Sequence, residues 1–249
     1  PGTFEESVTI NETNLTLTST DGPENTVIDA DGETEVIQIE GGLNEVTVDG
    51  FTIQGGVFNQ LFQSSRPKGT GTAVNVLNNI VNAPDAYDRF GGSVQVTGNN
   101  SRIIGNTVET GSLNGSEEFD STGILVAMNS RTQPLVNVTI RDNTVSANTN
   151  IEDDVGIGVQ AFSEGDEITG IIVENNTVTD TKIGVGVFGN TVDTTFRQNE
   201  IDNASTGVEA VNNDAGSPVN TTIVSNDFSG GDVGVQIGDS GSLSIADNT

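Results

Sequence analysis

The sequence predicts an all-β solenoid, in which short parallel strands stack coil upon coil. The first observation is an asparagine that recurs seven times in the local frame hydrophobic-x-hydrophobic-x-x-Asn-x-hydrophobic, which is shorter in IIGNTV (103–108) and stops one residue after Asn248 in LSIADNT (243–249). The second is that the runs between these asparagines are short, alternate with period two and are rich in Val, Ile and Thr, without a helical pattern. The third is the abundance of glycine (31 residues) and asparagine in the turns, since both tolerate the left-handed backbone angles of tight corners.

The recurring asparagines are separated by a constant minimum with variable additions. They are Asn79, Asn106, Asn143, Asn176, Asn199, Asn226 and Asn248, and subtraction gives spacings of 27, 37, 33, 23, 27 and 22 residues. This spacing is typical of a solenoid, in which each repeat is one coil and each addition is a loop. We expect the asparagines to form an internal structural ladder, each side-chain amide bonding to its neighbours where the strand turns.

Stacked coils would also place one large apolar side chain per coil in a single interior column, with a spacing of about 4.8 Å. The predicted column is Val48, Val76, Ile140, Val173, Phe196, Ile223 and Ile245.

The expected strands follow one another along the chain. The opening runs are LTLTS (15–19), TVIDA (26–30), VIQIE (36–40) and VTVDGFTI (46–53). Later repeats add a second run that starts with glycine, where we expect a sharp bend: GILVA (123–127), GIGVQ (156–160), GVGVF (184–188), GVEAV (207–211) and GVQIG (234–238).

The pattern predicts one domain, residues 1–249, of about nine coils. Residues 1–53 form irregular N-terminal coils, 54–92 insert-bearing coils and 93–249 regular coils that stop mid-coil. Mid-coil ends expose strand edges, so we expect further sequence, neighbouring domains or subunits to cap them. End-to-end or homo-oligomeric assembly is one such hypothesis.

Composition narrows the function. The chain has 36 acidic and 8 basic residues, a net charge of −28, and neither histidine nor cysteine. This excludes an imidazole base, disulfides and thiolate or imidazole metal sites. The spread of acids argues against nucleic acid as a partner, and no apolar run is long enough for direct membrane insertion. Such acidity is typical of halophilic proteins in a high-salt environment; the alternative is an ordinary acidic extracellular protein.

PGTFEESVTI, LTLTS and TVIDA, followed by the NNTV and GVGV repeats, resemble the right-handed parallel β-helix superfamily of pectate-lyase-like proteins. The resemblance is closest to the NosD-type repeats of archaeal, in particular haloarchaeal, surface or secreted proteins. It implies a single-stranded right-handed parallel β-helix over essentially the whole chain, and an extracellular place at a cell or virion surface. It implies no single activity, because the fold hosts enzymes and adhesins alike.

The family's enzymes offer motifs to compare. The Gly-His-Gly segment of polygalacturonases and the Asp-Pro-His-Glu motif of alginate epimerases require histidine, which this chain lacks. No recognisable motif surrounds an Arg or Lys that could serve as a pectate-lyase base. A copper role like that linked to NosD proteins lacks soft ligands here.

Two acidic inserts follow Val108 and Val145 at similar phase in consecutive repeats. They carry Glu117, Glu118 and Asp120, and Glu152, Asp153 and Asp154. These six residues could hold Ca²⁺, the one candidate cofactor, since none is required. Glu117, Glu118, Asp153 and Asp154 could instead supply the carboxylate pair of a glycosidase. The alternative is a pair of solvated acidic loops.

The inserts within 54–92 gather aromatic and basic side chains. These are Phe58, Phe62, Arg66, Lys68, Tyr87, Arg89 and Phe90. Rings beside cations are typical of surfaces that bind a glycan or a protein partner. The alternative is that the rings pack as small satellite cores.

Eight Asn-x-Ser/Thr sequons, at Asn11, Asn14, Asn99, Asn114, Asn137, Asn175, Asn203 and Asn220, are compatible with a glycoprotein. Asn175 is the weakest candidate among them because it adjoins the ladder.

Together these observations favour a cell-surface or virion-associated structural and adhesion β-helix that binds carbohydrate or protein through residues 54–92. The alternative is a polysaccharide-degrading enzyme, either a carboxylate-only glycosidase or a Ca²⁺-dependent lyase. The sequence favours the non-enzymatic function, since no family catalytic motif is present.

Overall fold

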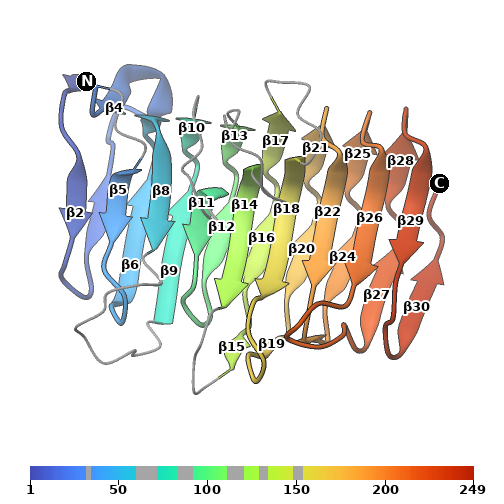
Figure 1. Cartoon of the computed structure of the whole chain (residues 1–249). Helices are drawn as coiled ribbons and strands as arrows, with labels where there is room; N and C mark the ends of the chain where they lie inside the picture. Colours follow the sequence, from blue (N-terminus) through green and yellow to red (C-terminus); the bar gives the residue numbers. More distant parts are fainter. Residues whose placement is uncertain (32–34, 60–71, 84–91, 111–120, 129–133, 148–153) are drawn as a thin grey trace.

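The computed structural model describes residues 1–31, 35–59, 72–83, 92–110, 121–128, 134–147 and 154–249. The chain winds into a right-handed parallel β-helix of nine coils, with its two termini at opposite ends of the solenoid (Figure 1). Every strand pairing is parallel, which confirms the predicted fold class. In the described residues one short 3-10 helix, η1 (Pro23–Asn25), is the sole helical element, and no helix there could cross a membrane.

Three sheets of nine strands form the walls of the solenoid. Sheet A contains β1 (Gly2–Phe4), β4 (Thr26–Asp29), β7 (Thr52–Gln54), β10 (Ile80–Ala83), β13 (Thr107–Thr110), β17 (Thr144–Ala147), β21 (Thr177–Thr179), β25 (Glu200–Asp202) and β28 (Asp227–Ser229). Sheet B contains β2 (Val8–Ile10), β5 (Glu35–Ile39), β8 (Gly56–Asn59), β11 (Gly92–Val96), β14 (Ser121–Met128), β18 (Asp154–Ala161), β22 (Ile183–Phe188), β26 (Thr206–Val211) and β29 (Val233–Ile237). Sheet C contains β3 (Thr16–Thr18), β6 (Asn44–Asp49), β9 (Thr72–Leu77), β12 (Arg102–Ile104), β16 (Thr139–Arg141), β20 (Ile172–Glu174), β24 (Thr195–Arg197), β27 (Thr221–Val224) and β30 (Leu243–Ala246). A small fourth sheet joins β15 (Leu135–Val136), β19 (Ile168–Thr169) and β23 (Thr191–Val192).

The core runs the length of the solenoid as columns of stacked side chains. The strand register confirms the predicted stacking in sheet C, since it pairs Val48 with Val76, Val173 with Phe196 and Ile223 with Ile245. The column is interior as far as Ile223, whereas Ile245, on the last strand of the sheet, is 49% exposed. The structure adds Ile103, which lies between Val76 and Ile140. Because the strands alternate inward and outward residues, each coil contributes its aliphatic side chains to one continuous interior.

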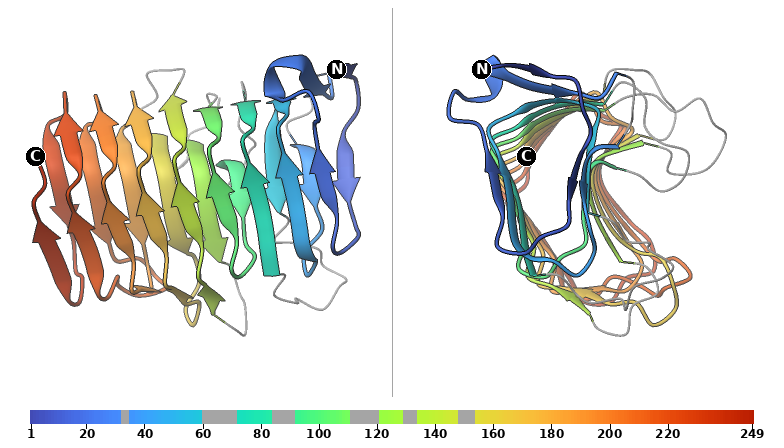
Figure 2. Two further views of the ribbon diagram at one scale, coloured as in Figure 1. Left: turned by 180° about the vertical axis from the view of Figure 1, so that it is seen from behind. Right: turned by 90° about the vertical axis from the view of Figure 1, so that its left-hand side faces the viewer.

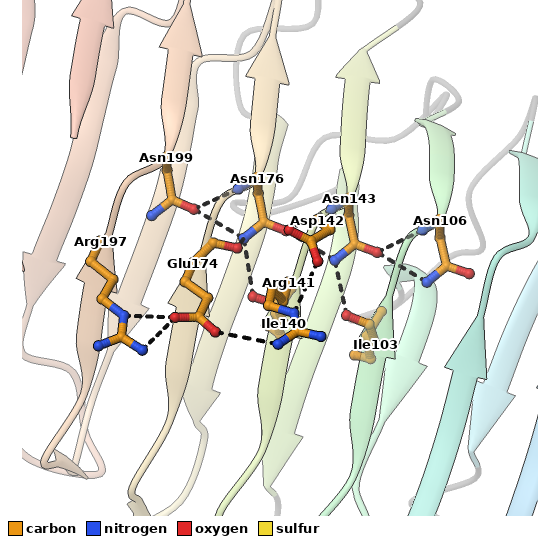
Figure 3. Close-up of polar contacts among 10 residues, drawn as sticks. All are labelled: Ile103, Asn106, Ile140, Arg141, Asp142, Asn143, Glu174, Asn176, Arg197 and Asn199. Carbon is orange, nitrogen blue, oxygen red and sulfur yellow. Dashed lines mark hydrogen bonds and ion pairs between the residues drawn. The ribbon is translucent and has the colours of Figure 1, made fainter. Parts of the chain in front are cut away.

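The asparagine ladder lies at the corner between sheets C and A (Figure 3). Asn143 is typical: its Oδ1 accepts the backbone N–H of Asn106 at 2.9 Å and the Asn106 Nδ2 at 3.0 Å. Its own Nδ2 donates to the Ile103 carbonyl at 2.9 Å and to Asn176 Oδ1 at 2.9 Å. The same pattern continues to Asn248, so the ladder is confirmed.

The repeated glycines serve close packing rather than the expected bend. A Cβ on Gly184 would lie 2.7 Å from the carbonyl oxygen of Gly207 and would also collide with Ile201 of the next coil. Gly123 and Gly156 are enclosed in the same way. The bend comes a few residues earlier, at left-handed residues such as Asp180 (φ 59°) and Asn203 (φ 55°).

Candidate functional site on the outer face of sheet B

From β6 onward, the connections differ in length between coils at the two edges of sheet B. From β6 to β28, each turn from sheet C to sheet A contains two residues, the second being Phe51 or a ladder asparagine. The connections that enter or leave sheet B instead range from one residue, Gly55 between β7 and β8, to twelve, residues 60–71 between β8 and β9. Residues 32–34, 84–91, 111–120 and 148–153 join it from sheet A, and 60–71 and 129–133 leave it toward sheet C. The end-on view in Figure 2 shows sheet B as the wall between these two corners.

Of the aromatic and basic residues predicted to bind a ligand, Phe58 lies on a strand of sheet B and the other six belong to these connections. Phe58 lies on β8, where its backbone pairs with that of Gln95 on β11. Phe62, Arg66 and Lys68 (within 60–71) and Tyr87, Arg89 and Phe90 (within 84–91) lie outside the described residues. Their role in binding therefore stays a prediction, attached to the two edges of sheet B.

Of the six acidic residues predicted to bind Ca²⁺ or to supply a catalytic pair, Asp154 alone lies among the described residues. It begins β18, is buried and pairs with Ser121 of β14. Glu117, Glu118, Asp120, Glu152 and Asp153 lie outside the described residues. The ends of the two inserts are described: Thr110 pairs with Ala147 where they depart, and Ser121 with Asp154 where they return. The inserts are thus anchored on neighbouring strands at both ends.

Within the described ranges, no group of three or more acidic side chains is arranged to hold a metal ion. The acidic inserts are not among those ranges, so Ca²⁺ binding by them stays a prediction.

The described part of sheet B carries a mixed apolar and polar outer face. One outward row crosses the strands in register: Gln95, Leu125, Gly158, Gly186, Glu209 and Gln236. A second hydrophobic cluster, separate from the main core, consists of Val155, Ile183 and Phe188, with Val211 packed against it. The ring of Phe188 covers Gly186, because a Cβ there would collide with it. A bare glycine therefore lets an aromatic ring lie flat on the sheet.

Glu209, which is half-buried, and Gln236, which is exposed, are polar residues next to this buried cluster. The Gln236 Nε2 donates to Glu209 Oε1 at 2.9 Å. Partial burial raises the pKa of the Glu209 carboxyl above its usual range, and the nearby Lys182 ammonium opposes that shift. A carboxylate and an amide can bind sugar hydroxyls, whereas the side chains of Val155, Ile183 and Phe188 are buried. The half-buried Val211 is the member of this cluster that a sugar ring could contact.

Sequence reasoning missed Glu209, although the repeat alignment holds a signal for it. In GVEAV (207–211) the third residue is a glutamate, where GIGVQ (156–160) and GVGVF (184–188) have glycine. A charged residue at an outward position where the two preceding coils have glycine indicates a change in the chemistry of the surface.

Sheet C has a different outer face, which pairs its charges internally. Arg102, Arg141 and Arg197 lie there, and Lys182 is the one further cation in the described residues. Arg197 Nε contacts Glu174 Oε2 at 2.6 Å, while Arg141 Nη1 is 3.9 Å from Glu174 Oε1 and its Nε 2.9 Å from Asp142 Oδ2 (Figure 3). Since Arg141 and Arg197 pair with Asp142 and Glu174, this part of the face is a poorer candidate for ligand binding than sheet B.

No protein-family model and no curated protein matches the chain. Among solved structures, it is similar to the Dettilon tailspike protein, with a TM-score of 0.52 and 14% identity over 98% of this chain and 60% of that one. It is also similar to endopolygalacturonase I from Stereum purpureum (TM-score 0.48, 16% identity, 98% and 92% coverage). A third is the periplasmic alginate epimerase AlgG (TM-score 0.44, 13% identity, 96% and 70% coverage).

These neighbours are right-handed parallel β-helix proteins. Together with the parallel strand pairing, the likeness to the tailspike protein defines the fold of this chain as a parallel β-helix. At these identities the likeness shows the fold alone, and the chain spans 60% of the tailspike chain's length.

Proposed function

We propose that this chain is an extracellular β-helical module that binds glycan through the outer face of sheet B. It would act as a rigid structural and adhesion element on a cell or virion surface. The carrying observation is that the connections at the edges of sheet B range from one to twelve residues in length, whereas each described turn from sheet C to sheet A from β6 onward has two residues. Binding residues concentrate on connections held by a rigid scaffold, so variation confined to one wall marks that wall as the functional one.

Glu209 and Gln236 support a glycan as the ligand. Their hydrogen-bonded carboxylate and amide are half-buried and exposed, respectively, and the half-buried Val211 lies next to them over a buried apolar cluster. The predicted aromatic residues Phe58 and Tyr87 belong to the same wall or its connections. A protein partner would use the same surface, and the binding experiment separates the two ligands.

The net charge of −28 supports a high-salt, haloarchaeal setting of the NosD type. Molar salt shortens the Debye length to about 3 Å and so removes most of the self-repulsion of such a surface. A virion setting draws support from the fold shared with a tailspike protein.

A second candidate function, polysaccharide cleavage, rests on a separate observation. The two acidic inserts depart and return on neighbouring strands, so Glu117 or Glu118 and Asp153 or Asp154 are tethered to adjacent coils. Adjacent strands are about 4.8 Å apart, which is compatible with a carboxylate pair across a glycosidic bond. In a lyase, the same acidic residues would instead bind Ca²⁺.

The test is a glycan-array screen combined with a polysaccharide-depolymerisation assay in molar KCl, with and without Ca²⁺. Binding that is lost in Glu209→Gln and Gln236→Ala, and kept in the sheet C control Thr195→Ala, would support the proposal. Phe58→Ala and Tyr87→Ala would show whether the connections share in it. Product release that depends on Glu117, Glu118, Asp153 or Asp154 would make the protein an enzyme. Protein capture without glycan binding, or no binding at all, would overturn the glycan proposal.

A further inference from the structure

The eight sequons differ in what their asparagine side chains do. An N-glycan is attached to Nδ2, so a usable acceptor must present that atom to solvent. Asn137, Asn203 and Asn220 commit Nδ2 to the neighbouring coil: it donates to Asn100 Oδ1 at 3.2 Å, Asp180 Oδ1 at 2.7 Å and Asp193 Oδ1 at 3.1 Å. In these three sequons the asparagine has a structural role.

Two further sequons are set aside for other reasons. Asn99 is partly buried, and its Oδ1 accepts the backbone N–H of Val136 at 3.0 Å. Asn114 lies outside the described residues.

Asn11, Asn14 and Asn175 remain, and all three are exposed. Their Nδ2 atoms have no hydrogen-bond partner among the described residues. Asn14 (φ 56°) and Asn175 (φ 53°) occupy left-handed corners like those of the three committed asparagines, so the unpartnered Nδ2 is what distinguishes them.

Asn175 reverses the ranking that the sequence gives. It precedes the ladder residue Asn176, yet the two side chains face opposite ways, since Asn176 is buried and Asn175 is exposed. Its Oδ1 takes no part in the ladder, whose acceptors are Asn176 and Asn199 at this level. A substituent on Asn175 Nδ2 would therefore project from the corner without touching the ladder.

We propose that Asn14 and Asn175 are N-glycan acceptors, with Asn11 as the alternative acceptor beside Asn14. The inference rests on the extracellular location proposed above. A lipid-phosphate-linked oligosaccharide would be the donor. A C–N bond forms between Asn Nδ2 and the anomeric carbon, the carbon–oxygen bond to the lipid phosphate breaks, and the phosphate leaves with the electron pair. One Nδ2 proton passes to a base of the transferase.

The experiment is glycopeptide mass spectrometry of the protein isolated from the cells that make it. Glycan is expected on the peptides that contain Asn175 and on those that contain Asn11 and Asn14, and not on those of Asn137, Asn203 or Asn220. Thr177→Val removes the Asn175 sequon while keeping a β-branched residue on β21, and Thr177→Ser keeps the sequon. The Asn175 glycan should disappear in the first variant and remain in the second.

Unmodified Asn14, Asn11 and Asn175 peptides, or glycan on Asn137, Asn203 and Asn220 instead, would overturn the inference. A circular-dichroism melt of both Thr177 variants shows whether a lost glycan reflects a lost fold. The result is independent of the ligand screen: glycan attachment without ligand binding would sink the binding proposal alone, and the reverse would sink this one.

Discussion

The backbone amide of Phe51 donates to the side-chain oxygen of Asn79 at 3.0 Å. Phe51 occupies the ladder position of its own coil, yet its side chain is buried and apolar. The ladder is therefore directional: each side-chain oxygen serves the backbone of the coil before it. An asparagine matters most to its N-terminal neighbour, and the ladder can begin on a residue that has no side-chain amide.

Replacing a central ladder residue should be costly. Asn143→Ala would remove the acceptor for the Asn106 backbone amide and the donor to the Ile103 carbonyl, both in the buried corner. Each buried polar group left without a partner costs about 1–3 kcal/mol. We expect the free energy of unfolding to fall by at least about 2 kcal/mol, measured by urea denaturation in molar KCl.

Asn248→Ala is the matched control for Asn143→Ala. Asn248 plays the same role for Asn226, but it is only half-buried, so water can replace its hydrogen bonds. Its substitution should cost clearly less. Equal losses in the two variants would contradict the view that burial of the ladder sets its contribution.

The glycine column should be intolerant of even one methyl group. In Gly184→Ala the new Cβ would meet the Gly207 carbonyl, a backbone atom that cannot move aside. Overpacking of this kind costs about 1–3 kcal/mol. Gly158→Ala is the control, because its nearest atoms are the Thr122 methyl at 3.2 Å and Leu125 Cδ1 at 3.4 Å. Thermal melts in which Gly184→Ala is no less stable than Gly158→Ala would contradict close packing as the reason for this glycine.

The ladder and the interior column were predictable because both repeat at a fixed offset, with the column residue three positions before the asparagine. Ile103 was left out of the predicted column because the apolar frame is shorter in its repeat. Ser101 stands there in place of the valine found in the neighbouring repeats, Val74 and Val138. The structure gives the reason: the Ser101 hydroxyl donates to the Gly98 carbonyl at 2.7 Å and accepts the Val74 amide at 3.0 Å.

The candidate site was less predictable from the sequence, because its residues come from different coils and form no local sequence motif. Glu209 and Gln236 are 27 positions apart and become neighbours only through the register of β26 and β29. The raised pKa of Glu209 likewise depends on burial beside other strands. The acidic inserts could be aligned from their phase because Val108 and Val145 mark equivalent points in consecutive coils.

The ion pairs on sheet C should contribute little, and only at low salt. Arg197→Gln would remove the contact with Glu174 and make the net charge more negative, so both effects destabilise the protein when screening is weak. The Arg197 side chain is 46% exposed, and exposed pairs are worth up to about 1 kcal/mol. We expect a small loss of thermal stability at 50 mM KCl, of the order seen for surface pairs, that disappears in molar KCl. A loss that persists in molar KCl would show that Arg197 acts through packing instead.

Glu209 should make a small, pH-dependent difference to stability. Partial burial raises its pKa in the folded protein above the usual 4.5, so folding favours the protonated form. The penalty is therefore fully present above the raised pKa, shrinks as the pH falls through it, and vanishes below the usual value. Glu209→Gln, which can still accept from Gln236, should be slightly more stable than the parent protein at neutral pH. Solvent screening keeps the gain below about 1 kcal/mol.

The difference in unfolding midpoint between the two proteins, measured from pH 8 to pH 4 in molar KCl, checks this directly. Other carboxyls titrate in both proteins and cancel in the difference. Lys182→Gln provides the internal test: Lys182 lowers the Glu209 pKa, so its removal should move the pH at which the gain disappears to a higher value. A gain from Glu209→Gln that stays constant over the whole range would mean that the carboxyl is not desolvated. The polar pair on sheet B would then be an ordinary surface contact, and the glycan proposal would lose its described anchor.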